Sequence, residues 1–134
     1  MATYTAKRLL VGDDIVIVNA EQAVLSGSRD YFQELYAGRR TMMSKADPAK
    51  SAKQSWSRRP DLLFRRIIRG MLPKDTKRGR DALRKLRIYI GVPAEFEAQK
   101  SSFEQPAKRS SNLTSRKTTL LQLSNKLGWV PHDA

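Results

Sequence analysis

Residues 60–91 read PDLLFRRIIRGMLPKDTKRGRDALRKLRIYIG, and this stretch predicts a helix, a turn, a second helix and a strand in succession. Pro60 and Asp61 suit the first turn of a helix, because proline lacks an N–H that would be unbonded there and aspartate favours the positive end of the helix dipole. Pro73 cannot continue that helix, since its ring clashes with the preceding turn. The stretch therefore predicts one helix from residue 60 to about residue 72.

The first of these helices has two chemically different sides. Its apolar residues recur at the i, i+3, i+4, i+7 spacing of a buried stripe and are Phe64, Ile67, Ile68 and Met71. Arg65, Arg66 and Arg69 fall on the other side. We therefore expect Met71 to fill the core, and the helix to present a cationic face.

The second helix repeats this arrangement. Thr76 can cap its first turn, and Asp81 precedes Lys85 by four residues, the favourable order for an ion pair. Residues 87–90, which end at Gly91, predict a strand. The basic residues of the second helix form a stripe made of Lys77, Arg80 and Arg84.

Upstream of this stretch the chain alternates between helical and extended patterns. Residues 4–11 predict a short helix, and the continuous β-branched run at 15–18 predicts a strand covered on both faces, as in a parallel sheet. A second short apolar piece lies at 24–25. We expect a further helix to begin after Ser28 and to end at Gly38.

The positive charge is concentrated in the middle of the chain. The 134 residues include 26 Lys and Arg against 13 Asp and Glu, a net charge of +13. Residues 38–90 alone hold 17 basic residues against four Asp, so this segment carries the whole excess. Such crowded like charges repel, and a polyanion relieves the repulsion. Nucleic acid is the favoured partner over a merely solvated basic face or an anionic membrane, which would require a large apolar face.

The apolar residues of 39–59 recur with no clear helical or strand period, so this segment predicts a basic loop extension. Trp56 is equally compatible with stacking on an unpaired base and with packing beneath the loop. The cations of the segment are Arg39, Arg40, Lys45, Lys50, Lys53, Arg58 and Arg59.

Several chemistries are excluded or disfavoured by composition. The chain has no Cys and a single His, His132, so thiolate metal sites, disulfides and two-His motifs are absent. We expect no catalytic residue, metal, cofactor or small-molecule substrate, because the four Asp residues of the basic segment are widely spaced. No run of about 18 apolar residues or signal-peptide core is present, so we expect a cytoplasmic protein without a membrane span.

The end of the chain, residues 94–134, is low in apolar content until its last part and predicts an extended tail. Leu120, Leu123 and Leu127 recur at helical spacing, and Gly128 suits the end of a short helix. We expect this helix to dock on this protein's own surface or on a partner's.

The run from Ile68 to Pro73, then Gly79-Arg80, then Leu86 to Gly91, resembles the signature of the universal large-subunit ribosomal protein L-thirteen family. Residues 16–21 with Ser26-Gly27 are similar to its second strand and following turn. The loop and the Leu-Gly-Trp tail resemble the archaeal and eukaryotic branch. The similarity covers about residues 4–93.

The resemblance implies a three-layer α/β/α fold around a small, mainly parallel sheet, with residues 1–93 as the ribosomal RNA-binding core and 94–134 as the tail. It implies direct binding to large-subunit ribosomal RNA beside neighbouring ribosomal proteins, a role in subunit assembly, and no catalysis. A basic RNA-binding or RNA-processing protein outside the ribosome is the alternative. The residues of the structural motif are Gly70, Met71, Leu72, Pro73, Gly79 and Gly91.

RNA contacts are expected between residues 39 and 84 of the basic segment. We assign phosphate contacts within the motif to Lys74, Lys77, Arg78 and Arg80, and close backbone approach to Gly70 and Gly79. The remaining expected contacts are Arg39, Arg40, Lys45, Lys50, Lys53, Trp56, Arg58, Arg59, Arg65, Arg66, Arg69 and Arg84.

One departure from the family concerns the sheet. Family members usually begin with a strand before the helix that this chain places at residues 4–11. Its absence predicts an unpaired sheet edge. Either the start codon was assigned too far downstream, or the ribosome tolerates a reduced sheet.

Overall fold

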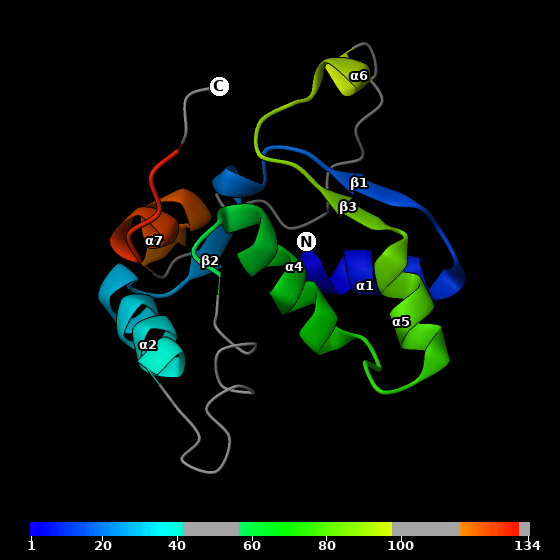
Figure 1. Ribbon diagram of the computed structural model, residues 1–134, viewed down its shortest axis with the longest axis horizontal. Coiled ribbons are helices and arrows are strands. Elements are labelled where there is room, and N and C mark those ends of the chain that lie inside the picture. Colours follow the sequence, from blue (N-terminus) through cyan, green and yellow to red (C-terminus); the bar gives the residue numbers. More distant parts are fainter. Residues whose placement is uncertain (42–56, 98–115, 132–134) are drawn as a thin grey trace.

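The computed structural model describes residues 1–41, 57–97 and 116–131, and helices make up most of it (Figure 1). In chain order its elements are α1 (Ala2–Val11), β1 (Ile15–Ile17), the 3₁₀ turn η1 (Ala20–Gln22), β2 (Val24–Ser26), α2 (Arg29–Thr41), α4 (Pro60–Met71), α5 (Lys77–Arg84), β3 (Leu86–Ile88), α6 (Ala94–Glu97), β4 (Lys117–Thr119) and α7 (Leu120–Lys126).

Two small sheets stand where one was expected. β1 and β3 pair in parallel, with Ile15 opposite Leu86, whereas β2 and β4 pair antiparallel, with Ser26 opposite Lys117. The α/β class is therefore confirmed, but the described strands form two separate two-stranded sheets, of which one is parallel. The strands are three residues long, so neither sheet buries much surface by itself.

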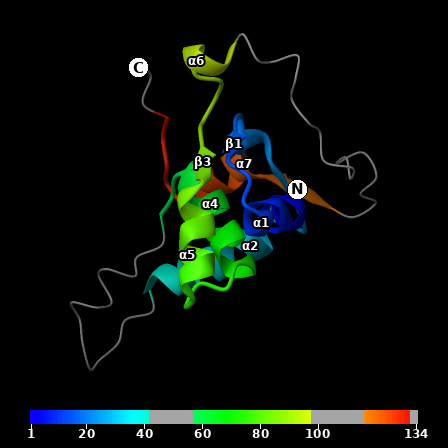
Figure 2. The same cartoon turned by 90° about the vertical axis from the view of Figure 1, so that its right-hand side faces the viewer.

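The strand β1 is covered on one face only, so the prediction of a strand buried on both faces is wrong. Ile17 is 9% exposed, whereas Val16 on the opposite face is 40% exposed. α4 and α5 pack beside β3, and they lie together with α1 on the same side of the molecule in both views (Figures 1 and 2). Within the described part of the chain β3 is the only strand neighbour of β1, which leaves the other edge of β1 unpaired.

Helix α4 runs through the centre of the core. Leu63, Phe64 and Ile68 are buried, as the apolar stripe predicts, and Leu72 is buried just after the helix ends. Met71 is 46% exposed, so its assignment to the core is wrong. Met71 is the last residue of α4, and the chain turns there into an extended Leu72, which occupies the core in its place.

The end of the chain belongs to the same core. Thr119 caps α7 in a reciprocal capping box with Gln122, and the predicted helix ends before Gly128. Leu120 and Leu123 are fully buried where α7 packs against α2, α4 and η1. The sequence left open whether this helix docks on the protein's own surface or on a partner's, and in the structure it docks on the protein's own surface.

Of two helix ends predicted from single residues, the start of α5 is where it was expected and the end of α2 is not. The hydroxyl of Thr76 accepts a hydrogen bond from the Gly79 N–H at 3.2 Å and caps α5. Gly38 does not end α2, which continues to Thr41. A single glycine costs a helix only about 1 kcal/mol relative to alanine, which is too little to stop it.

The ion pair expected between Asp81 and Lys85 does not form. Asp81 instead contacts Arg84 at 3.3 Å, one turn away on α5. Lys85 donates to the carbonyl oxygen of Gly12 at 2.7 Å and so ties α5 to the end of α1. Lys85 follows the last residue of α5, and its side chain therefore leaves the helical row that the i, i+4 rule assumes.

Candidate nucleic-acid interface

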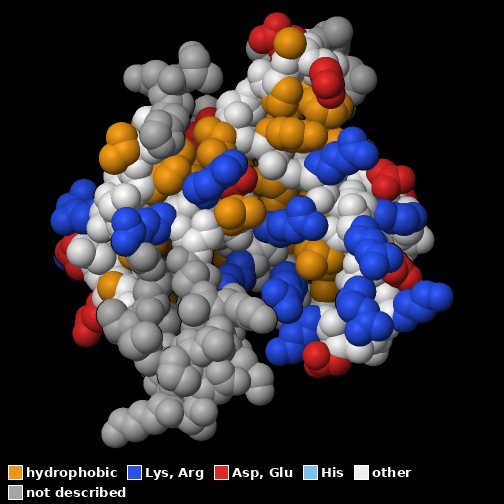
Figure 3. Space-filling model, in the orientation of Figure 1, with side chains coloured by type: hydrophobic (Ala, Val, Ile, Leu, Met, Phe, Trp, Pro, Cys, Tyr) orange, Lys and Arg blue, Asp and Glu red, His pale blue; other side chains and the backbone are white. Residues whose placement is uncertain are grey.

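Basic side chains cover α4, α5 and the turn that joins them (Figure 3). This follows from the packing of both helices, because their apolar sides face the core and leave the arginines and lysines outside. Arg65 and Arg66 are half-buried at the edge of this surface. We call it the α4–α5 surface, and its exposed cations are Arg69, Lys74, Lys77, Arg78, Arg80 and Arg84.

Three of these cations have no competing contact. The side chains of Arg69, Lys74 and Lys77 make no ion pair or hydrogen bond with another residue that the structure describes. Their charge is therefore uncompensated within the described residues. They lie at the end of α4, in the turn and at the start of α5, a continuous stretch of the chain.

The other exposed arginines also serve the fold. Arg78 donates to the carbonyl oxygen of Leu10 at 3.2 Å, and Arg80 donates to that of Asp75 at 3.4 Å. Arg84 holds Asp81. A guanidinium has five N–H donors, so each of these side chains keeps donors for a phosphate while one or two hold it in place.

A groove of about 240 Å³ runs between α4 and α5. Arg65 lines it and donates to the carbonyl oxygen of Leu83 at 3.3 Å, which links the two helices. The walls combine guanidinium planes with apolar side chains, a surface suited to ribose and base as well as phosphate. The lining residues are Ser57, Leu62, Leu63, Arg65, Arg66, Arg69 and Leu83.

The predicted contacts in the loop extension divide into three groups. Arg59 binds the 9% exposed Asp61 through two hydrogen bonds of 3.2 and 2.9 Å, and Arg58 donates to the Gly128 carbonyl oxygen at 3.3 Å. Arg39 and Arg40 belong to α2, not to a loop. Lys45, Lys50, Lys53 and Trp56 lie outside the described residues.

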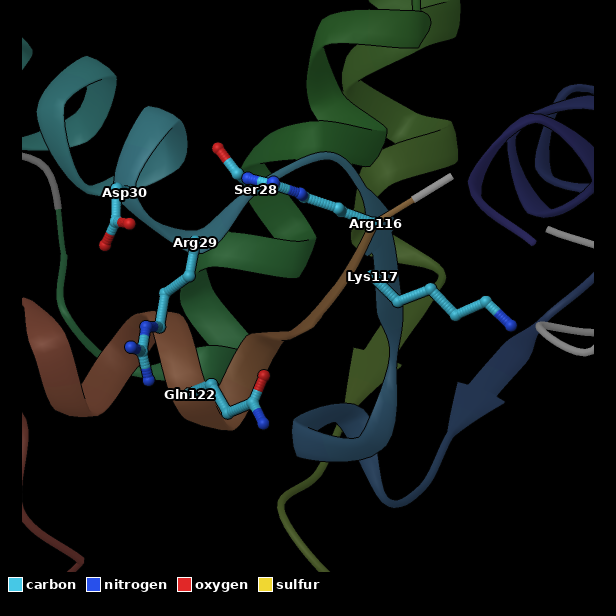
Figure 4. A pocket seen from close by; sticks show the side chains of 6 residues that line it. All are labelled: Ser28, Arg29, Asp30, Arg116, Lys117 and Gln122. Carbon is cyan, nitrogen blue, oxygen red and sulfur yellow. The ribbon is translucent and has the colours of Figure 1, made fainter. Parts of the chain in front are cut away.

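Sequence reasoning missed a second basic cluster, formed by Arg29, Arg116 and Lys117 (Figure 4). These residues are distant in the chain and belong to segments whose net charge is close to zero, so a count along the sequence does not reveal them. The pairing of β2 with β4 brings them together. Only the register between β2 and β4, which joins segments far apart in the chain, would have revealed this cluster.

Acidic and metal-ligating side chains are scattered over the part of the chain that the structure describes. No group of three His, Cys, Asp or Glu side chains lies close enough to hold a metal ion in the described ranges. Two of the basic segment's carboxylates are engaged, since Asp61 pairs with Arg59 and Asp81 with Arg84. In the same ranges, every helix is too short or too polar to cross a membrane.

Comparisons with known proteins agree with the resemblance drawn from the motif. A family model described as ribosomal protein L13 matches residues 1–95. The large ribosomal subunit protein uL13 of Methanopyrus kandleri is 37% identical over 131 residues, which cover 96% of this chain and 79% of that protein. The uL13 of Methanococcus maripaludis is 43% identical over 93 residues, 69% of this chain and 67% of that one. The uL13 of Caenorhabditis elegans is 37% identical over 134 residues, 99% of this chain and 65% of that one.

Proposed function

The chain belongs to the ribosomal protein L13 family and is a structural constituent of the large ribosomal subunit, and we propose that its α4–α5 surface binds the RNA of that subunit. Members of this family are not enzymes, so the proposed role is to hold RNA in place. Other large-subunit proteins are its neighbours in this proposal, and assembly of the subunit is the process it supports.

The observation that carries the proposal is the uncompensated charge of Arg69, Lys74 and Lys77. Three exposed cations without partners among the described residues repel one another in the isolated protein. A phosphate backbone removes that repulsion and releases condensed counterions, which makes the binding favourable at physiological salt. Recognition then rests on the backbone and on shape, since nothing assigns base readout to a particular side chain.

The remaining predicted contacts extend this surface. Arg78, Arg80 and Arg84 add phosphate contacts through the donors that the fold does not use, and Arg65 and Arg66 line the groove between the helices. Arg58 and Arg59 contribute beside the start of α4. We also assign RNA contacts to Arg39, Arg40, Lys45, Lys50, Lys53 and Trp56.

The fold and domain predictions that accompany this function are also proposals. In the ribosome the chain adopts the family's three-layer α/β/α arrangement, with residues 1–93 as its main RNA-binding part. The basic extension at 39–59 reaches RNA beyond the core. Family membership and the parallel pairing of β1 with β3 support this view.

The salt dependence of RNA binding tests the proposal. Purified chain is titrated with protein-free large-subunit RNA at several salt concentrations, and the logarithm of affinity is plotted against the logarithm of salt concentration. Each lost phosphate contact flattens that slope by about 0.7–0.9. The triple variant Arg69→Gln, Lys74→Gln, Lys77→Gln should therefore have a log–log slope that is shallower than the wild-type slope by about 2.

A matched control separates local contacts from net charge. Lys7→Gln, Arg87→Gln and Lys126→Gln together remove the same charge from exposed positions outside the α4–α5 surface. This variant should keep most of the wild-type slope. Equal flattening in both variants would mean that the α4–α5 surface has no special part in binding, and an affinity insensitive to salt would exclude phosphate contacts altogether.

A further inference from the structure

A second basic surface lies at the junction of α2, β4 and α7, and it shares no lining residue with the groove on α4 and α5. It surrounds an open hollow of about 370 Å³. The side chains of Arg29, Arg116 and Lys117 make no ion pair or hydrogen bond with another described residue. Among the described residues, Asp30 is the only carboxylate of the lining, whose members are Ser28, Arg29, Asp30, Arg116, Lys117 and Gln122.

Backbone pairing holds these cations in place. The Gly27 N–H donates to the Arg116 carbonyl oxygen at 2.7 Å, next to the register that sets Ser26 opposite Lys117. The hydroxyl of Thr118, which is 1% exposed, donates to the Gly27 carbonyl oxygen at 2.9 Å. The two basic residues of the β4 segment are thus fixed beside the start of α2, whose helix dipole adds positive potential.

The side chains of the three cations do not converge on one point (Figure 4). Arg116 extends toward Ser28, Arg29 lies toward Gln122, and Lys117 points away from both (Figure 4). A small anion is bound best by donors that meet at one place, whereas donors that lie apart can each hold a different phosphate of an extended polyanion. Arginine forks fit the phosphates of such a chain in pairs of hydrogen bonds.

We propose that this hollow is a second RNA-backbone site, which holds a segment of large-subunit RNA other than the one on the α4–α5 surface. The inference rests on the proposed function, because it takes ribosomal RNA as the polyanion. An acidic protein segment is the other polyanion to consider. Protein interfaces centre on buried apolar or aromatic anchors, and none of the described residues that line this hollow is apolar, so RNA is favoured.

Charge neutralisation measures the contribution of the site. The triple variant Arg29→Gln, Arg116→Gln, Lys117→Gln is compared with the control triple at Lys7, Arg87 and Lys126, which carries the same change in charge. We expect the first to flatten the salt dependence of RNA binding by about 2 and the control to change it much less. Melting temperatures are measured alongside, so that a loss of binding is not confused with unfolding.

Directed cleavage of the RNA locates the site. The chain contains no cysteine, so a single introduced thiol takes one iron chelate that cuts nearby RNA by hydroxyl radicals. Ser26→Cys places the chelate on exposed β2 opposite Lys117, and Asp75→Cys places it in the turn beside Lys74. We expect two separate sets of cleaved nucleotides.

The outcomes distinguish the second site from the proposed function. Cleavage from Asp75→Cys without cleavage from Ser26→Cys, together with an unchanged slope in the Arg29 triple, overturns the second site and leaves the α4–α5 surface standing. A second result to look for is that the Arg29 triple keeps its affinity for RNA and yet fails to incorporate into reconstituted subunits. That result would overturn the second RNA site in favour of an acidic protein segment as the partner. Absence of RNA binding by the wild-type chain overturns both.

Discussion

Gly79 shows how one atom in the motif decides whether the turn can close. A Cβ added to Gly79 would lie 2.0 Å from the carbonyl oxygen of Pro73, a backbone atom that cannot move aside. The same oxygen accepts hydrogen bonds from the backbone N–H and the hydroxyl of Thr76, at 3.1 and 2.9 Å. Glycine is therefore needed for the turn itself.

Gly79→Ala should destabilise the protein by about 1–3 kcal/mol, the cost of overpacking a tight site. Gly70→Ala is the matched control, because nothing lies within 4 Å of the Cβ it would add, and an alanine in a helix should stabilise by up to about 1 kcal/mol. Urea denaturation midpoints measure both. Equal destabilisation would show that the contact with Pro73 is not what selects glycine at residue 79.

The sequence predicts a close backbone approach at Gly79, but as part of RNA binding, whereas the close contact in the structure is with Pro73 of the same chain. That contact depends on how far the chain bends back between α4 and α5, which the motif does not specify. Lys85 was misplaced for a related reason. The i, i+4 rule describes positions inside a helix, and Lys85 lies just beyond the end of α5, where Gly12 became its partner.

At the scale of elements, α4 both fills the core and presents the basic surface. Its buried stripe begins one residue earlier than the sequence pattern indicated, at Leu63, and it ends with Leu72 in place of Met71. Arg65 and Arg66 are half-buried at the groove, and Arg69 remains exposed.

Ile68→Ala should cost about 2–5 kcal/mol of unfolding free energy, because Ile68 is fully buried and its truncation leaves a cavity. Met71→Ala, on the same helix but 46% exposed, should cost much less than Ile68→Ala. Neither change removes a cation, so RNA binding by the folded fraction should stay near wild type. If Met71→Ala lowered the unfolding free energy as much as Ile68→Ala, Met71 would have to be counted among the core residues.

The helices were more predictable than the sheets for a physical reason. Caps and breakers act locally, so Pro60, Thr76 and Gly128 marked the ends they were expected to mark. Gly38 failed because a glycine weakens a helix without forbidding it. Strand partners, in contrast, depend on segments far away in the chain, and strands of three residues carry too little pattern to specify them.

The whole molecule carries a net charge of +13, and residues 38–90 alone have an excess of that size. That charge opposes compaction of the free protein, and salt screens it with a Debye length of about 10 Å at 0.1 M. The charge also explains why the basic segment indicated a polyanion from the sequence alone. The cluster at Arg29, Arg116 and Lys117 escaped notice because only the folded molecule assembles it.

The melting temperature of the RNA-free chain should rise when salt is increased from about 0.02 to 0.3 M, since screening weakens the self-repulsion. Circular dichroism at a fixed protein concentration measures the change. The triple variant Arg69→Gln, Lys74→Gln, Lys77→Gln should respond less, because it has less repulsion to screen. A melting temperature that falls with salt would mean that attractive ion pairs outweigh the repulsion.

The pairing of β2 with β4 has a consequence for how the protein is made. Thr118 and Gly27, joined by a hydrogen bond, are 91 positions apart in the chain, and the leucines that α7 buries come later still. A growing polypeptide leaves the apolar surfaces of α2 and α4 uncovered until residues 116–127 have left the translating particle. The core therefore closes only after those residues are made, and synthesis interrupted before them would release a cationic fragment with exposed apolar surface, which is prone to aggregate.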